Sequence, residues 1–460
     1  MGSGLRTWLS LREVIEKNLF KIGLTGEALF YSLYLVMSRN LFVLYLTSLG
    51  FPVTLISGIV FLSTIISTLT SMLIYKYFKF ISRISRNEFL LFYVFEKLFF
   101  IPIGFSSDPL TIILCYTIVM VSSIFSSLYT NFLIYGLLGE EDIRDITAKR
   151  TAVSNIVNIL GYILVIFIFY SFKDVAKFKI LFTLGGLLGS VSIIFLVSIK
   201  TESQSILMSV VGEDKKPERT FSITSFFTAL LLSSNIFNLA WTPYLMRVLN
   251  TPDYLVTIIN FAGSLASVFS AILWSKASFK KLRISLFLTS LTPILAVLSP
   301  LPILHVGVSF FGSFTFMGAN FLGLFLFARQ RSLIGIVRIS LLLTLITNLS
   351  QFLSAIFGIM FREDYVVLFM SSLAVRLISI LIAYFTITEV AVVPEEYART
   401  FSQILYSNTL LGYTFIIDTV RRSIIVSLKI LSISAVLLLL YIVYRFLFFI
   451  LHVLDVYHIL

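Results

Sequence analysis

A doubled pattern of hydrophobic segments constrains this chain more than any other feature. Six apolar runs precede a charged stretch at 201–220, and six more follow it. Runs of about 17–25 residues are long enough to cross a bilayer as helices, and a spanning helix satisfies its own backbone hydrogen bonds. With 58% hydrophobic residues, the chain does not have the composition of a soluble domain. The pattern predicts an all-α polytopic membrane protein built from two six-helix bundles.

The hydrophobic runs also place the individual helices and domains. We predict membrane helices at 27–48, 52–75, 89–104, 110–136, 151–170, 180–199, 221–249, 254–274, 284–298, 306–328, 339–361 and 365–387. The corresponding domains are an N-terminal bundle at 27–199, a cytoplasmic central loop at 200–220, a C-terminal bundle at 221–387, a cytoplasmic or interfacial segment at 388–429 and an additional membrane helix at 430–453. Because this last helix contains Arg445, an interfacial position is the alternative to a span.

Lysine and arginine residues in the loops orient the predicted bundles. Most of them lie in the N-terminal tail and in the loops on the same side as that tail. The exceptions up to residue 387 are Lys173, Lys177, Lys179, Arg247 and Arg362. Because positively charged loops stay in the cytoplasm, the sequence predicts a cytoplasmic N-terminus in a multi-pass protein of the cell (plasma) membrane. No early apolar core with a cleavage site is present, so no removable signal peptide is expected.

Charge and residue usage argue against several other classes of protein. The formal net charge of +12 is spread over short loops beside an anionic lipid surface, so nucleic acid is not an expected partner. A single cysteine, Cys115, excludes a disulfide within the chain, and His305, His452 and His458 lack the spacing of metal ligands. The loops contain no phosphate-binding motif or nucleophile elbow. We therefore expect no enzyme activity, no metal site and no cofactor.

The two halves of the sequence resemble each other. A shift of 200 positions aligns Pro52 with Pro252, and a shift of 189 aligns Asn131 with Asn320. Apolar sequences align easily by chance, but here the helix number and the charged inner loops also agree. The sequence therefore predicts an internal repeat in which a pseudo-two-fold axis relates the two bundles.

Residues 27–387 resemble the major facilitator superfamily of transporters. The resemblance rests on the six-plus-six topology, the charged central loop, the basic loops after the second and eighth helices, and the basic residues before the fifth and eleventh. The loop at 75–83 and its counterpart at 274–281 depart from the family pattern because they contain neither glycine nor an acidic residue. This marks a divergent member. The resemblance implies that the two bundles rock about a central site that opens alternately to each side.

In such a fold, the first, fourth, fifth, seventh, tenth and eleventh helices are expected to line the central cavity. Polar residues at helical spacing in these helices are the candidates, since a lipid-facing surface has little use for amides and hydroxyls. The candidate cavity residues are Tyr34, Ser38, Arg39, Asn131, Asn235, Asn238, Thr242, Asn320 and Asn348. The shift of 200 also places Ser38 over Asn238. Interhelical packing through small and hydroxylated side chains is the alternative explanation for these polar stripes.

Ionisable residues inside the predicted spans carry more weight, because each costs about 2.5–3.5 kcal/mol at a helix centre. Arg39 could bind an anionic group of a substrate or a carboxylate from a neighbouring helix. Glu96 is the one acidic residue well inside a predicted span and is therefore the candidate for proton coupling. Its neighbour Lys97 projects about 100° away around the helix and need not pair with it. Arg376 is expected to be structural.

Together these features predict a secondary active transporter or facilitator that moves a small solute by alternating access. The expected partners are the lipid bilayer, a small-molecule substrate and a coupling ion such as a proton, with the chain acting as a monomer. A non-transporting membrane scaffold and a transporter of lipid-linked molecules are the alternatives. The scarcity of buried acidic residues favours the scaffold, whereas the polar stripes favour transport.

Overall fold

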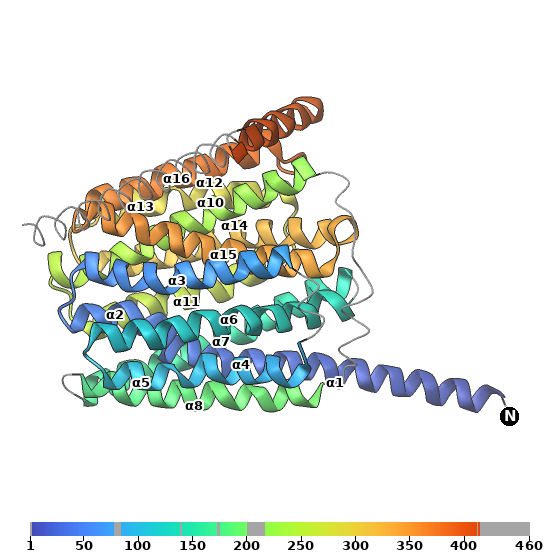
Figure 1. Ribbon diagram of the computed structural model, residues 1–460, viewed down its shortest axis with the longest axis horizontal. Helices are drawn as coiled ribbons and strands as arrows, with labels where there is room; N and C mark the ends of the chain where they lie inside the picture. Colours follow the sequence, from blue (N-terminus) through green and yellow to red (C-terminus); the bar gives the residue numbers. More distant parts are fainter. Residues whose placement is uncertain are drawn as a thin grey trace, which may run out of the picture. The chain divides into compact units, whose positions relative to one another are not determined.

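The computed structural model describes residues 2–77, 84–138, 140–172, 175–199, 217–411 and 413–414. All regular structure in these ranges is helical, and they contain no strand (Figure 1). Eleven helices within the same ranges are long and apolar enough to cross a membrane. The chain forms two compact units, Met1–Arg399 and Thr400–Leu460. The prediction of an all-α polytopic membrane protein is confirmed.

The first part of the chain, which we call the N-half, contains the elements from α1 to α8. Their bounds are α1 Gly2–Met37, η1 Arg39–Leu41, α2 Phe42–Ser48, α3 Val53–Lys76, α4 Arg86–Leu98, α5 Phe100–Phe105, α6 Pro109–Leu137, α7 Glu140–Ser171 and α8 Ala176–Ser198. Capping defines several of these starts. Ser85 and Glu88 form a reciprocal capping box at α4, and Asp108 accepts a hydrogen bond from Thr111 at α6.

The elements from α10 to α16 form the C-half. Their bounds are α10 Pro217–Pro243, η3 Tyr244–Val248, α11 Asp253–Ser275, α12 Phe279–Thr289, α13 Leu291–Leu298, α14 Leu304–Ile334, α15 Ile336–Phe361 and α16 Tyr365–Thr386. Each of the twelve predicted segments is therefore helical. The third and ninth are divided into two shorter helices, α4 with α5 and α12 with α13. The pair α12 and α13 is still one of the eleven candidate spans, Phe279–Leu298, whereas α4 and α5, which contain Glu88, Glu96 and Lys97, are not among them.

The turn that follows the first segment shares two backbone features with the turn that follows the seventh. Gly50 and Asn250 both have positive φ, at 82° and 50°, a region that glycine and asparagine tolerate better than other residues. Two positions later, Pro52 and Pro252 both precede the next helix with extended ψ, at 156° and 150°. This local identity supports the predicted repeat, and the superposition of the whole bundles stays a prediction.

The correspondence does not extend back into the helices that lead to these turns. The first segment contains the tight 3₁₀ turn Arg39–Leu41, whereas the seventh ends in the wide π-helical turn Tyr244–Val248. A tight turn and a wide turn change the helix register in opposite directions. Ser38 is accordingly fully buried, whereas the side chain of Asn238 is exposed. The two residues that the shift of 200 aligns therefore lie in different environments.

Two pairs of helices make most of the contact between the N-half and the C-half, and α6 also packs on α15. α3 packs along α15, and α7 packs along α11. Phe61 of α3 stacks on Phe352 of α15 with 5.3 Å between ring centroids, and Asn348 Nδ2 donates a hydrogen bond to Ser71 Oγ at 3.0 Å. The other large helix contacts lie within one half, such as α1 with α8 and α10 with α16. The halves thus meet along two seams.

We name the two ends of this helical unit by the predicted orientation. The inner end carries the N-terminal part of α1 and lies at the right in Figure 1, and the outer end carries the turns at Gly50 and Asn250 and lies at the left. Residues 388–411 are described, with a helix at 395–411, whereas the predicted helix at 430–453 lies outside the described residues.

Candidate substrate cavity

A cavity of about 490 Å³ lies between the N-half and the C-half, lined by α1, η1, α4, α6 and α7 on one side and by α10, α14 and α15 on the other. The charged lining residues are Glu27, Arg39 and Arg150, and all three belong to the N-half. The lining residues of the C-half are Phe227, Leu231, Phe316, Asn320, Leu324, Leu343, Thr344, Thr347 and Asn348. One wall is therefore charged, and the wall that faces it is neutral.

Four of the candidates predicted from the sequence line this cavity. Arg39 and Asn131 belong to the N-half wall, and Asn320 and Asn348 belong to the C-half wall. Asn131 and Asn320, which the repeat aligns, thus contribute to opposite walls of the same cavity. These are the residues best placed to contact a solute.

The other candidates lie outside the cavity lining. Tyr34 is buried, and its hydroxyl donates to the Glu96 carbonyl oxygen at 3.0 Å. Ser38 is packed closely against Gly185 of α8, and Asn235 Nδ2 donates to Ser350 Oγ at 3.0 Å. Asn238 is exposed and Thr242 is half-buried, and neither lines the cavity. Their polarity serves interhelical packing or surfaces elsewhere in the molecule.

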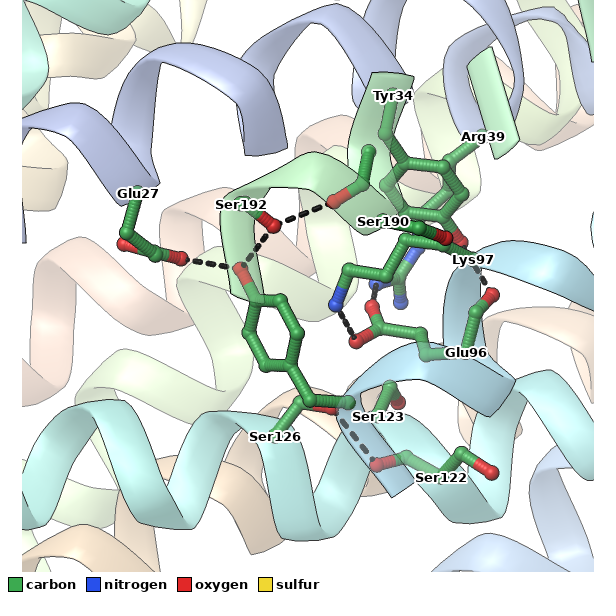
Figure 2. Close-up of polar contacts among 12 residues, drawn as sticks. Glu27, Tyr34, Arg39, Glu96, Lys97, Ser122, Ser123, Ser126, Ser190 and Ser192 are labelled. Atoms are coloured by element: carbon green, nitrogen blue, oxygen red, sulfur yellow. Dashed lines mark hydrogen bonds and ion pairs between the residues drawn. The ribbon is translucent and has the colours of Figure 1, made fainter. Parts of the chain in front are cut away.

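A buried group of charges lies behind the N-half wall (Figure 2). Lys97 Nζ is 2.5 Å from Glu96 Oε2, and Arg39 Nη1 is 3.8 Å from Glu96 Oε1. Glu96 and Lys97 both have 0% relative exposure. The expectation that these two neighbours need not pair is wrong, because the long lysine side chain folds back along the helix to reach the carboxylate. We call Arg39, Glu96 and Lys97 the charge cluster.

Three tyrosine rings surround the Lys97 ammonium group. Its Nζ lies 3.3 Å from the ring centroid of Tyr93, 4.9 Å from that of Tyr31 and 5.6 Å from that of Tyr34. Aromatic faces attract a cation, and more strongly where water is excluded. The rings therefore help to offset the cost of burying this lysine, together with its single carboxylate partner.

A second buried acidic residue, Glu27, lies on the cavity wall. Its side chain is 2% exposed and belongs to the span Leu19–Ser48, so Glu96 is not the only acid inside the membrane region. Glu27 Oε1 accepts a hydrogen bond from the Tyr93 hydroxyl at 2.6 Å, and its Oε2 lies 2.6 Å from Arg150 Nη2. Ser192 also donates to the Tyr93 hydroxyl oxygen. Tyr93 thereby links the two acidic sites through its ring and its hydroxyl group.

Neither Glu27 nor Arg150 was predicted from the sequence as a site residue. Glu27 sits at the edge of the predicted first helix, and Arg150 resembles an ordinary basic residue of an inner loop. In the structure, α1 and α7 both extend further toward the inner end, to Gly2 and Glu140, which brings these residues into helical walls. A signal existed in Glu27 itself, since an acidic residue that begins an apolar run is a candidate for an intramembrane ion pair.

The buried arginine of the C-half has a different environment. Arg376 is 3% exposed, and its Nε donates to Ser233 Oγ at 2.7 Å. Its Nη1 donates to the Thr289 carbonyl oxygen at 2.6 Å, next to the break between α12 and α13. Arg376 thus ties three segments of the C-half together and does not line the cavity.

Contacts between the two halves join them at the outer end, around a second cavity of about 440 Å³. Lys177 of the N-half forms an ion pair with Asp253 of the C-half, and Arg247 donates to the carbonyl oxygen of Phe51 across the same boundary. Arg247 also pairs with Glu363 at 2.6 Å. At the inner end, by contrast, Lys21 pairs with Asp142 inside the N-half.

Comparisons with solved structures identify the architecture. A mutant form of the nucleoside transporter NupG matches with a TM-score of 0.56 and 13% sequence identity, over 79% of this chain and 98% of that one. The fold is that of the major facilitator superfamily. A bacterial homologue of the iron transporter ferroportin, in an outward-facing state, matches with a TM-score of 0.59 and 15% identity over the same shares of the two chains. Its iron-soaked form gives 0.58 and 16%.

These likenesses concern the fold alone. No family model matches the sequence, and no curated protein matches it. Within the described ranges, no group of three or more histidine, cysteine, aspartate or glutamate side chains is placed to hold a metal ion. The chemistry of this major facilitator fold therefore has to be argued from its own cavity.

Proposed function

We propose that the chain is a membrane transporter that moves a small solute by alternating access. The cavity between the two halves carries this proposal. Its lining comes from the middle and inner parts of the helices, while Lys177 with Asp253 and Arg247 with Phe51 join the halves at the outer end. A solute site between two halves that are joined at the outer end is what a transporter needs in its inward-facing state.

The charge of the cavity bears on which solute it takes. Among its charged lining residues, Arg39 and Arg150 carry two positive charges and Glu27 carries one negative charge. The two similar structures are named as a nucleoside transporter and an iron transporter homologue. A metal cation would meet net repulsion here, so a neutral or anionic organic solute fits this cavity better. We also propose a monomer in the plasma membrane with a cytoplasmic N-terminus.

Side-specific cysteine labelling tests the alternating access. In a Cys115→Ser background, Asn320→Cys reports on the central cavity. Thr47→Cys reports on the outer end, because Thr47 lines the outer cavity beside Lys177 and Asp253 and is only 6% exposed. An impermeant maleimide should label Asn320→Cys from the cytoplasmic side and leave Thr47→Cys protected. Adding Asp253→Asn should raise the labelling rate of Thr47→Cys several-fold, because the ion pair that joins the halves is lost.

Asp145→Asn is the matched control, since Asp145 pairs with Lys21 and Lys149 inside the N-half. It should change the Thr47→Cys labelling rate much less than Asp253→Asn does. A rigid membrane scaffold would label identically in all three backgrounds, and that result would overturn the proposed transport function.

A further inference from the structure

Arg39 is the member of the charge cluster that reaches the cavity. Its side chain is 20% exposed, whereas those of Glu96 and Lys97 are 1% and 0% exposed. The helix is broken at this point, with Arg39 opening the 3₁₀ turn that joins α1 to α2. A solute in the cavity therefore meets the charge of the cluster through the Arg39 guanidinium group.

That guanidinium group is held loosely. Its Nη1 lies 3.8 Å from Glu96 Oε1, its Nη2 lies 3.9 Å from Met120 Sδ, and the Tyr31 side chain interacts with it. A well-formed bond between arginine and a carboxylate is about 2.7–2.9 Å long. Since a guanidinium group has five donors, Arg39 keeps hydrogen-bonding capacity for an oxygen that enters the cavity.

Glu96 has an unused acceptor on the Arg39 side. Its Oε2 accepts from Lys97, whereas its buried Oε1 accepts no hydrogen bond from the described residues. The titratable and charged groups next to Glu96 are Lys97 and Tyr93 from α4, Tyr31 and Tyr34 from α1, and Arg39 from η1. Beyond them, Tyr116 of α6 faces Arg39, Glu27 of α1 faces Lys97 and Tyr93, and Arg150 of α7 pairs with Glu27. Of the cations in this set, Arg39 is the one that both faces Glu96 Oε1 and lines the cavity.

We propose, as an extension of the transporter function, that Arg39 binds an oxyanion group of the solute, and that Glu96 takes up a proton as the anion binds. The oxyanion is a carboxylate or a phosphate, because both match the planar donors of arginine. An ionised Glu96 next to Arg39 repels such an anion and competes with it for the guanidinium group. A proton on Glu96 removes the repulsion, and the neutral carboxyl group still accepts a hydrogen bond from Lys97.

The charges balance in this step. Arg39 and Lys97 against Glu96 leave the empty cluster with one excess positive charge. A monoanion at Arg39 adds one negative charge, and the proton on Glu96 restores the original value. One proton and one monoanion therefore enter the buried site together without adding charge to it. The neutral amide and hydroxyl groups of the C-half wall remain for the uncharged part of the solute.

Ligand-dependent melting of the purified full-length chain tests the proposal. The probes are lactate and dimethyl phosphate, which both stay monoanions between pH 6.0 and pH 7.5, with lactamide and trimethyl phosphate as their uncharged counterparts, measured at those two pH values. At least one anion should raise the melting temperature, because it binds the native state, and the uncharged counterparts should not. The apparent Kd of the anion should fall by up to about tenfold per pH unit on acidification, the limit for one linked proton.

Variants separate the roles of the two residues. Arg39→Gln should abolish the anion-dependent shift, and Arg39→Lys should weaken it while it retains the fold. Glu96→Gln should bind the anion equally well at both pH values. Arg376→Lys is the matched control, because it alters a buried arginine that does not line the cavity and should keep the anion-dependent shift.

Several outcomes would overturn the inference. These are the absence of any anion-dependent shift, equal binding of the uncharged counterparts, binding by the native chain that does not depend on pH, and an unchanged anion shift in Arg39→Gln. If lactate and dimethyl phosphate differ, the comparison shows whether the oxyanion is a carboxylate or a phosphate. The labelling of Asn320→Cys and Thr47→Cys requires no anion, so the proposed transport function can stand or fall separately.

Discussion

The N-half and the C-half follow the same helical plan but bury different chemistry. Both have a broken first helix, a divided third helix and a turn in which a residue with positive φ precedes an N-cap proline. The N-half buries Glu96 and Lys97 behind a cavity wall that contains Glu27, Arg39 and Arg150. The C-half faces that wall with amides, hydroxyls and apolar groups.

The difference is clearest at the buried cations. Lys97 is compensated by a carboxylate and three tyrosine rings, whereas Arg376 is compensated by a serine hydroxyl and a threonine carbonyl. The first arrangement can change its charge by binding a proton, and the second cannot. We infer that the repeat supplies the shared scaffold for movement, while recognition of charge and coupling are concentrated in the N-half.

The largest expected effect concerns transport driven by a proton gradient. Glu96→Gln should abolish concentrative uptake or efflux of the anion and leave exchange across the membrane measurable, because a glutamine cannot carry the proton. Asn320→Ala, on the neutral wall, should instead change the apparent KM several-fold and keep accumulation. Proteoliposome assays with and without an imposed pH gradient compare the two. Undiminished accumulation in Glu96→Gln would show that coupling does not reside in the charge cluster.

The second prediction compares the stability of the two buried cations. Lys97→Met leaves the Glu96 carboxylate buried without its nearest partner, so we expect a loss of about 3–5 kcal/mol in folding free energy. Arg376→Met leaves neutral groups without a donor, for which about 1–3 kcal/mol is expected. The melting temperatures of the purified variants should fall in that order.

A double substitution provides the control for this comparison. Lys97→Met combined with Glu96→Gln removes both charges and should recover much of the stability that Lys97→Met alone loses. If the double variant is no more stable than the single one, the ion pair is not what makes Lys97 important. The tyrosine rings would then account for the effect.

The sequence allowed the fold to be predicted because hydrophobic length and loop charge are local properties. All twelve helical segments followed from apolar runs, and Pro52 and Pro252 revealed the repeated turn. Arg39, Asn131, Asn320 and Asn348 were found as cavity residues because a polar group in an apolar helix is conspicuous. These features require no knowledge of how side chains meet.

The charge cluster could not be assembled in the same way. Neighbouring residues on a helix project about 100° apart, so helical spacing does not predict that the Lys97 side chain bends back to Glu96. Glu27 and Arg150 were misjudged because each lies where a predicted helix meets a loop. The alignment of Ser38 with Asn238 assumed an uninterrupted register, which the 3₁₀ turn in one half and the π-helical turn in the other do not preserve.

The smallest expected effect tests the one place where the two halves are most alike. Gly50 has φ of 82° and its counterpart Asn250 has φ of 50°, so the two turns should accept each other's residue. Gly50→Asn and Asn250→Gly should each change the folding free energy by about 0.5 kcal/mol or less, whereas Gly50→Ala should cost about 1 kcal/mol. A Cβ at Gly50 meets no atom within 4 Å, so that cost comes from the backbone alone. Thermal melting of the three variants decides the matter. If Gly50→Asn destabilises the protein as much as Gly50→Ala, the turn at Gly50 does not accept the residue found at Asn250. The two turns would then differ in their sequence requirements although both have positive φ.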